Sequence, residues 1–208
     1  MFVQNDYKPR DRELGYRLIE DIVFGTLVTA TPRLDASHIP FMVERSRGSC
    51  GTLIGHLDRR NPQCEALRHS GEALVSFLGP HSYVSPAWYK STPHVPTWYY
   101  VTVQVRGGVT IVSDSQSLTD MVCDLSRAME PEDSSWRPEQ VSGYTARLVH
   151  GIVGFEIAIT DIQTQIRIGQ QNSNSDRSDV RAALSRGNIR QRELAEWIAV
   201  YEAHEEST

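Results

Sequence analysis

The chain has 208 residues, of which 39% are hydrophobic and 23% are charged, as expected for one globular domain with or without a helical extension. Its 21 basic and 26 acidic residues give a net charge of −5, which disfavours non-specific binding to the phosphate backbone of nucleic acids. The three cysteines form no CxxC pair, and no apolar run reaches the roughly 20 residues that span a bilayer, so we expect a cytoplasmic protein with reduced thiols.

The order of helical and strand-like segments predicts a barrel with helices at its edge. Leucine and isoleucine at helical spacing predict a first helix from about Asp11 to Asp21. Six later segments are rich in β-branched and aromatic residues and are bounded by proline, glycine and serine. These predicted strands are 25–32, 38–44, 51–57, 73–80, 99–113 and 151–168.

Further helices interrupt the strands without a βαβ rhythm. The predicted helices are 62–69 after an Asn61 cap, 117–129, 138–150, and a pair within 176–206 that is separated near Gly187. The polar stretch 169–179 predicts a loop or hinge. We therefore expect an α+β fold, with a cofactor-binding barrel domain over 1–172 and a C-terminal helical extension over 173–208.

Histidines are candidate metal ligands in the first half of the chain. None of them has the HxH or HExxH spacing of a mononuclear zinc site, and each can equally be a packed or hydrogen-bonded histidine near a strand end. The candidates are His38, His56, His69, His81 and His94.

His56 lies next to a predicted anion site. It ends a strand and is followed by Arg59, Arg60, the Asn61 cap and a helix N-terminus. Two guanidinium groups beside a helix N-terminus suit a phosphate or a pair of propionate carboxylates, although a solvated turn has the same composition.

An aromatic, proline-rich stretch over 79–101 predicts a long ordered loop. Flat aromatic rings beside histidine suit a planar cofactor such as flavin or haem, and the same rings suit a dimer interface. Its aromatic members are Tyr83, Trp88, Tyr89, Trp98, Tyr99 and Tyr100. The chain contains no dinucleotide glycine loop, phosphate-binding P-loop or Gly-x-Ser-x-Gly elbow, which excludes those enzyme classes.

Five blocks in this order carry a family resemblance: ASHIP, GHLDRRNPQ, GPHSYVSPAWY, VPTWYYVTVQVRG and GIVGFEI. Over roughly residues 1–172 the chain resembles the PaiB family of FMN-binding negative transcriptional regulators. The resemblance implies a split β-barrel similar to that of flavin-binding oxidases of pyridoxine phosphate, in a homodimer with the cofactor at the subunit interface. The family's cofactor-binding positions then correspond to His38, His56, Arg59, Arg60, Asn61, Tyr83, Ser85, Trp88 and Tyr89.

Two departures from the family pattern point to a haem-binding branch. The chain has Tyr99 and Tyr100 where the family reads Asn-Tyr, and Arg167–Asn172 replaces a Lys-Leu-Ser-Gln-Asn-Arg segment. The chain is similar in the same blocks to piperazate synthases, which use haem to close the nitrogen–nitrogen bond of L-piperazate from N5-hydroxy-L-ornithine. That likeness implies haem b rather than FMN, and a small amino-acid substrate.

Roles follow for single residues under this hypothesis. His56 is the expected axial ligand, and Arg59 and Arg60 are expected to bind propionates, or the phosphate of FMN. Trp98 is expected to wall the pocket with the other aromatic residues. Lys90 and Tyr99 are the candidate catalytic residues, with Lys90 holding a substrate carboxylate or acting as a base if it is desolvated.

Two other functions stay open, an FMN-binding transcriptional regulator and a flavin oxidoreductase. The acidic composition and the lack of an evident helix-turn-helix weigh against DNA binding. The C-terminal helices carry an apolar stripe, so we expect them to dock on the barrel or on a second subunit.

Overall fold

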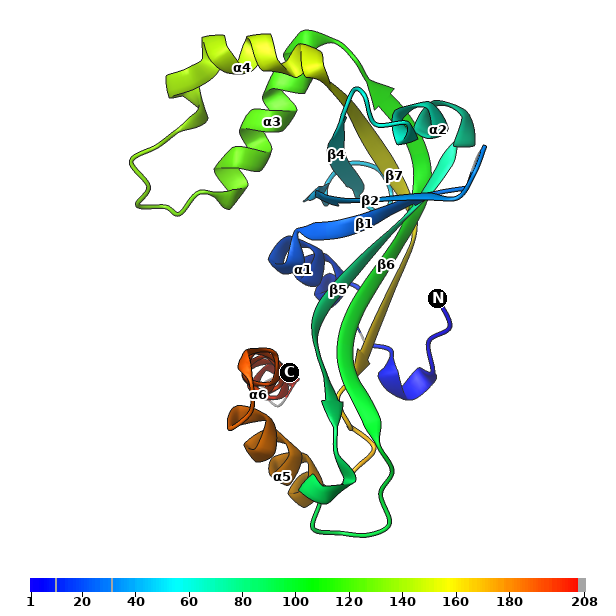
Figure 1. Ribbon diagram of the computed structural model, residues 1–208, viewed down its shortest axis with the longest axis vertical. Helices are drawn as coiled ribbons and strands as arrows, with labels where there is room; N and C mark the ends of the chain where they lie inside the picture. The colour runs from blue at the N-terminus through cyan, green and yellow to red at the C-terminus, as the bar shows by residue number, and fades with distance from the viewer. Residues whose placement is uncertain (10, 31, 206–208) are drawn as a thin grey trace. The chain divides into compact units, whose positions relative to one another are not determined.

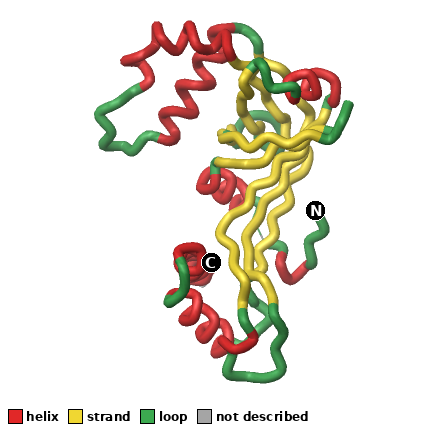
Figure 2. Tube along the Cα trace, viewed as in Figure 1, coloured by secondary structure: helices red, strands yellow, loops and turns green. Residues whose placement is uncertain are grey.

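The computed structural model describes residues 1–9, 11–30 and 32–205. Its strands form one antiparallel seven-stranded sheet in the order β2-β1-β5-β6-β7-β4-β3 (Figures 1 and 2). The strands are β1 (Phe24–Thr29), β2 (Asp35–Pro40), β3 (Met42–Glu44), β4 (Thr52–Asp58), β5 (Glu72–Val84), β6 (Thr97–Val112) and β7 (Ile152–Arg167). The predicted α+β class is confirmed.

Helices fill the connections between strands and the C-terminal segment. The α-helices are α1 (Glu13–Ile22), α2 (Gln63–Ser70), α3 (Ser115–Met129), α4 (Ser142–Leu148), α5 (Asn174–Ser185) and α6 (Ile189–Glu205). The 3₁₀ turns are η1 (Asn5–Tyr7), η2 (Pro86–Trp88), η3 (Pro138–Val141) and η4 (Val149–Gly151). Every predicted helix has a counterpart, although the one predicted over 138–150 is divided into η3, α4 and η4, and the predicted end at residue 206 lies outside the described residues.

The chain divides into two compact units, each assembled from separate segments. We call Ile19–Phe77 with Gln104–Ile162 the central unit, and Met1–Leu18, Leu78–Val103 and Gln163–Thr208 the terminal unit. The unit boundaries fall inside α1, β5, β6 and β7. The division expected at residue 172 stays a prediction.

Three aromatic rings form the centre of the central unit. Phe41 packs edge-on against Phe77 at 5.5 Å and against Phe155 at 6.2 Å between ring centroids, and each ring is at most 1% exposed. Gly55 makes this packing possible, because a Cβ there would lie 2.9 Å from Phe155 Cζ. Burial of three phenylalanines is a large apolar contribution to stability.

The single strand predicted over 38–44 is wrong. Phe41 separates β2 from β3, and its amide donates to the carbonyl of Val23 at 2.9 Å. Pro40 offers no amide at this point, so the ladder ends, and the Phe41 side chain turns into the core.

The terminal unit ends in two capped helices. Ser173 Oγ accepts from the amide of Asp176, and Asn188 and Gln191 exchange reciprocal side-chain to backbone hydrogen bonds. The loop predicted over 169–179 is therefore too long, because α5 begins at Asn174. The apolar side chains that the two helices bury are Val180, Leu184, Leu194, Ala195 and Ile198.

Candidate functional site

His56 lies on β4, directly opposite Gly154 of β7 in the antiparallel ladder, so the two positions share one face of the sheet. A Cβ at Gly154 would lie 2.6 Å from Leu118 Cδ2 and 3.1 Å from Met121 Sδ, which shows that α3 packs closely on this face. Glycine opposite His56 thus leaves room for the helix.

The His56 imidazole is half-buried and incompletely bonded. Its Nδ1 is buried and has no hydrogen-bond partner among the described residues, whereas the ring as a whole stays partly exposed. Burial lowers the pKa of His56, because desolvation penalises the imidazolium. A neutral imidazole with an accessible edge is the form that binds a metal.

The two arginines after His56 have partners within the central unit. Arg59 donates from Nε to the carbonyl of His150 at 2.8 Å and from Nη2 to that of Ile152 at 3.0 Å. Arg60 holds Asp58 through two bonds of 2.9 and 2.6 Å, which keep the pKa of Asp58 far below its usual range. Neither guanidinium is thus a free anion-binding group, and the Arg60 side chain is 90% exposed.

Asn61 and His38 both make structural contacts here. Asn61 Oδ1 accepts from the amide of Gln63, at the start of α2, while its Nδ2 donates to Ser37 Oγ at 2.9 Å. His38 Nδ1 lies 2.9 Å from Thr26 Oγ1 on the neighbouring strand. The helix predicted from Pro62 begins one residue later, at Gln63, so the N-cap position falls on Pro62 and not on the predicted Asn61. Asn61 still accepts from the amide of the first helical residue.

The predicted aromatic loop is shorter than expected, since β5 runs to Val84 and β6 begins at Thr97. On these strands, His81 stacks on Trp98 at 6.2 Å and Tyr83 meets the same indole edge-on at 6.5 Å. Trp98 is 53% exposed and Tyr83 is 42% exposed, so they form an accessible aromatic surface on the terminal unit. Ser85 caps η2 by accepting from the amide of Ala87, and Trp88 closes that turn.

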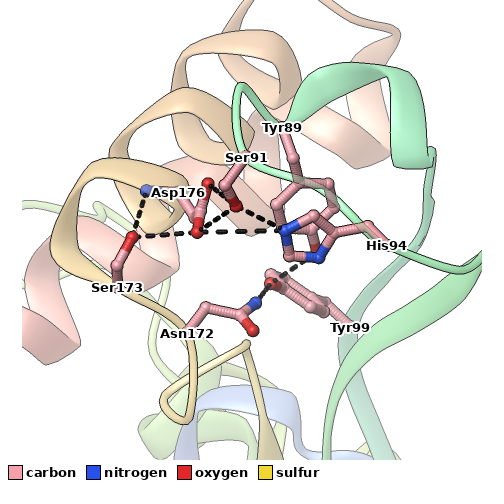
Figure 3. Close-up of polar contacts among 7 residues, drawn as sticks. All are labelled: Tyr89, Ser91, His94, Tyr99, Asn172, Ser173 and Asp176. Carbon is pink, nitrogen blue, oxygen red and sulfur yellow. Dashed lines mark hydrogen bonds and ion pairs between the residues drawn. The ribbon is translucent and has the colours of Figure 1, made fainter.

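Tyr99 is buried and hydrogen-bonded. Its hydroxyl lies 3.2 Å from that of Tyr89 and accepts from Asn172 Nδ2 at 3.3 Å (Figure 3). Burial, together with the Tyr89 hydroxyl, raises the pKa of Tyr99 far above its ordinary value. Gly169 is required beside it, because a Cβ there would lie 1.8 Å from the Tyr99 hydroxyl. Tyr99 therefore holds its proton, and within the terminal unit it is a packed residue and not an accessible acid or base.

A polar cluster that the sequence did not reveal joins the 85–96 connection to α5. Ser91 Oγ donates to both carboxylate oxygens of Asp176 at 2.9 Å and lies 2.8 Å from His94 Nε2 (Figure 3). The His94 ring stacks on Tyr89 at 3.8 Å, and Ser173 Oγ donates to Asp176 at 2.8 Å. These two serine hydroxyls lower the pKa of Asp176.

This cluster contains a serine, a histidine and an aspartate, but they are not arranged as a catalytic triad. The single hydroxyl proton of Ser91 is directed to the Asp176 carboxylate, so it is not given to His94 as a base. Asp176 instead fixes the connection to the first turn of α5. A sequence signal existed, because Ser173-x-x-Asp176 is a helix-start pattern inside the stretch predicted as a loop.

Lys90 is not desolvated. Its side chain is 81% exposed and its Nζ lies 2.8 Å from Asp179 Oδ1, a contact that raises the pKa of the lysine. The condition under which Lys90 was expected to act as a base is absent from this structure. The described residues also contain no group of three or more His, Cys, Asp or Glu side chains placed to hold a metal ion.

Known proteins are similar to this chain in sequence. Residues 1–161 match the family described as "Putative FMN-binding domain". The chain is 27% identical over 182 residues to protease synthase and sporulation protein PAI 2 of Bacillus subtilis, covering 86% of this chain and 87% of that protein. It is 34% identical over 206 residues to the uncharacterized protein AN0679 of Emericella nidulans, covering 79% and 82%.

Two solved structures share the fold at low sequence identity. The FAD and heme binding protein from Mycobacterium smegmatis aligns with a TM-score of 0.57 at 16% identity, over 85% of this chain and 80% of that chain. The flavocytochrome Anf3 from Azotobacter vinelandii aligns with a TM-score of 0.59 at 10% identity, over 83% and 75%. The predicted split barrel is confirmed. Across the described helices, none combines the length and apolar character needed to cross a membrane. The chain belongs to the PaiB-like FMN-binding family of split-barrel proteins.

Proposed function

We propose that the chain is a haem-binding enzyme of this family that cyclises N5-hydroxy-L-ornithine to L-piperazate, with His56 as the iron ligand. The observation that carries the cofactor assignment is the His56 ring, which is neutral, partly exposed and left with an unpartnered buried Nδ1. The resemblance to piperazate synthases supports the reaction.

The central unit fits haem at the ligand position and less well at the propionates. Leu118 and Met121 lie on the His56 face, but each is at most 7% exposed, so a haem would contact them only if α3 moved away from the sheet. Arg60 would reach a propionate by exchanging its exposed pair with Asp58, an exchange of low cost because exposed ion pairs contribute little. Arg59 would keep its two backbone carbonyls and would not hold a propionate.

Haem bound at His56 would supply a Lewis acid for the hydroxylamine oxygen, which makes hydroxide a better leaving group. In the reaction the α-amine nitrogen forms a bond to the N5 nitrogen, the N5–oxygen bond breaks, and one water leaves in total. Lys90 and Tyr99 both keep their protons at neutral pH, so neither would act as a base. Tyr99 is 2% exposed and would support the packing of the terminal unit, whereas the exposed Lys90 would bind the substrate. Lys90 would exchange Asp179 for the substrate carboxylate.

A homodimer is the proposed assembly. Trp98 and Tyr83 leave a large aromatic surface accessible on the terminal unit, and such surfaces are enriched at protein interfaces. Light scattering tests the assembly, and a monomer at micromolar concentration would contradict it.

FMN binding without this enzymatic activity is the second candidate. The match to an FMN-binding family model over residues 1–161 and the likeness to PAI 2 favour it. A flavin oxidoreductase would share the same cofactor. The exposed Arg60 would then meet the FMN phosphate in place of a propionate.

Reconstitution separates the candidates. Purified apoprotein is titrated with hemin and with FMN and followed by absorbance, for wild type, His56→Ala and the control His69→Ala. The His69 imidazole is exposed on α2, where it contacts Glu65. We expect a shifted Soret band for wild type and His69→Ala, and loss of that shift for His56→Ala. Haem-loaded protein is then incubated with N5-hydroxy-L-ornithine, and mass spectrometry detects loss of water. FMN binding without a Soret shift would overturn the haem assignment, and haem-loaded protein without product would overturn the reaction.

A further inference from the structure

A pocket lies wholly within the terminal unit. It has a volume of about 450 Å³, in the range of pockets that hold small molecules. The N-terminal segment, the end of β7, α5 and α6 line it. Tyr7, Ile166 and Ile168 contribute its buried apolar part, each at most 8% exposed.

The N-terminal wall of this pocket is anchored. The amino group of Met1 donates to Gln163 Oε1 at 2.5 Å, and the Tyr7 ring carries the Arg167 guanidinium 5.4 Å from its centroid. Tyr7 is itself buried. Asp6 and Lys8 on either side of Tyr7 are therefore held at the pocket by its packing.

Two of the four charged residues of the lining, Arg177 and Glu202, are paired with each other. Arg177 binds Glu202 Oε1 through Nε at 3.0 Å and Nη2 at 2.5 Å, and Arg181 binds Glu202 Oε2 at 2.9 Å. These contacts use both carboxylate oxygens of Glu202. Asp6 and Lys8 differ, since neither side chain makes an ion pair or hydrogen bond within the part of the chain that the structure describes.

We propose that this pocket binds a free α-amino acid with a short apolar side chain. Lys8 binds the carboxylate, Asp6 binds the ammonium group, and the apolar side chain lies toward Tyr7, Ile166 and Ile168. The Lys8 ammonium group and the Asp6 carboxylate are opposite in charge to the carboxylate and the ammonium group of an amino-acid zwitterion. A bare anion would meet Asp6 as a like charge, and a bare cation would meet Lys8.

This site is independent of the proposed function. His56 belongs to the central unit, whereas every residue lining this pocket belongs to the terminal unit. Binding is therefore measurable on the apoprotein, and its failure would leave the haem assignment untouched.

The test compares L-valine with two analogues that each lack one charge. Isovalerate has no ammonium group and isobutylamine has no carboxylate. Calorimetry and ligand-detected NMR on the apoprotein measure the dissociation constants. We expect valine to bind at millimolar concentration or tighter, and each analogue to bind about tenfold more weakly because one charged contact is lost.

Two single variants assign the contacts. Lys8→Gln and Asp6→Asn should each weaken valine binding about tenfold and leave the circular dichroism spectrum unchanged, because both side chains are exposed. Lys8→Gln should also remove the difference between valine and isobutylamine. The controls are Arg190→Gln and Asp133→Asn, which change exposed residues outside the pocket. No valine binding, equal binding of all three compounds, or unchanged binding by both pocket variants would each overturn the proposal.

Discussion

Two adjacent glycines on β6 should respond very differently to the same substitution. A Cβ at Gly107 would lie 2.1 Å from the carbonyl oxygen and 2.7 Å from the carbonyl carbon of Ala158 on β7. Ordinary van der Waals contact begins near 3.4 Å, so the β7 backbone would have to retreat by more than 1 Å. A Cβ at Gly108 would meet nothing closer than the Gly71 carbonyl oxygen, at 3.7 Å.

Gly107→Ala should lower the free energy of unfolding by about 3 kcal/mol or more, at the upper end of overpacking, because the obstructing atoms are backbone in a paired strand. Gly108→Ala should lie within about 0.5 kcal/mol of wild type or stabilise slightly, since alanine restricts the unfolded chain. Urea unfolding followed by circular dichroism should shift the Gly107→Ala midpoint by about 1 to 1.5 M at an unchanged slope. Equal midpoints for the two variants would refute the packing argument.

Three further substitutions test the sites. Tyr99→Phe should cost about 1–2 kcal/mol in urea unfolding, because the Tyr89 hydroxyl and the Asn172 amide lose a buried partner; wild-type stability would contradict this. Folding lowers the pKa of Asp176, so its contribution to folding stability is complete above its pKa in the unfolded chain and is lost as pH falls through its pKa in the folded protein. Asp176→Asn should therefore reduce the difference in unfolding free energy between pH ~5 and pH ~3. A difference equal to that of wild type would contradict this prediction. Folding also lowers the pKa of His56, so over part of the pH range the unfolded chain is protonated at His56 while the folded protein is not. The free energy of unfolding therefore decreases as pH falls below the pKa of His56 in the unfolded chain. His56→Gln should therefore lose less stability than wild type between pH ~7.5 and ~5.5, and an equal loss in both proteins is the contrary result.

Local chemistry explains how much of the fold was predictable. Alternating β-branched residues along 51–57 and 151–168 place side chains on opposite faces of a strand, and that pattern is readable without tertiary contacts. The break at Phe41 was not readable, because it depends on the aromatic core into which that ring turns. The sequence also showed arginines beside His56, whereas their partners lie at Asp58 and at backbone carbonyls more than ninety positions away.

The candidate sites were likewise predictable only where local sequence carried the signal. His56 stood out in the sequence because its neighbours are chemically distinctive, and the structure adds that one ring nitrogen is buried without a partner. The cluster of Ser91, His94 and Asp176 joins positions 85 residues apart, so no local pattern could combine them. Patterns within one segment identified candidate site residues. Contacts between segments far apart in the sequence determined which of those residues lie close together.

The unit boundaries have a consequence for how this sequence can vary. At Phe77 and Leu78, at Val103 and Gln104, and at Ile162 and Gln163, the chain leaves one unit and enters the other inside a strand. One inserted residue at any of these points would turn every following side chain of that strand to the opposite face. Neither unit can therefore be exchanged as a continuous stretch of gene. New binding properties would have to arise by point substitution or by lengthening connections such as 85–96. Residues inserted there lie between strands and do not shift the pairing of a strand with its neighbours.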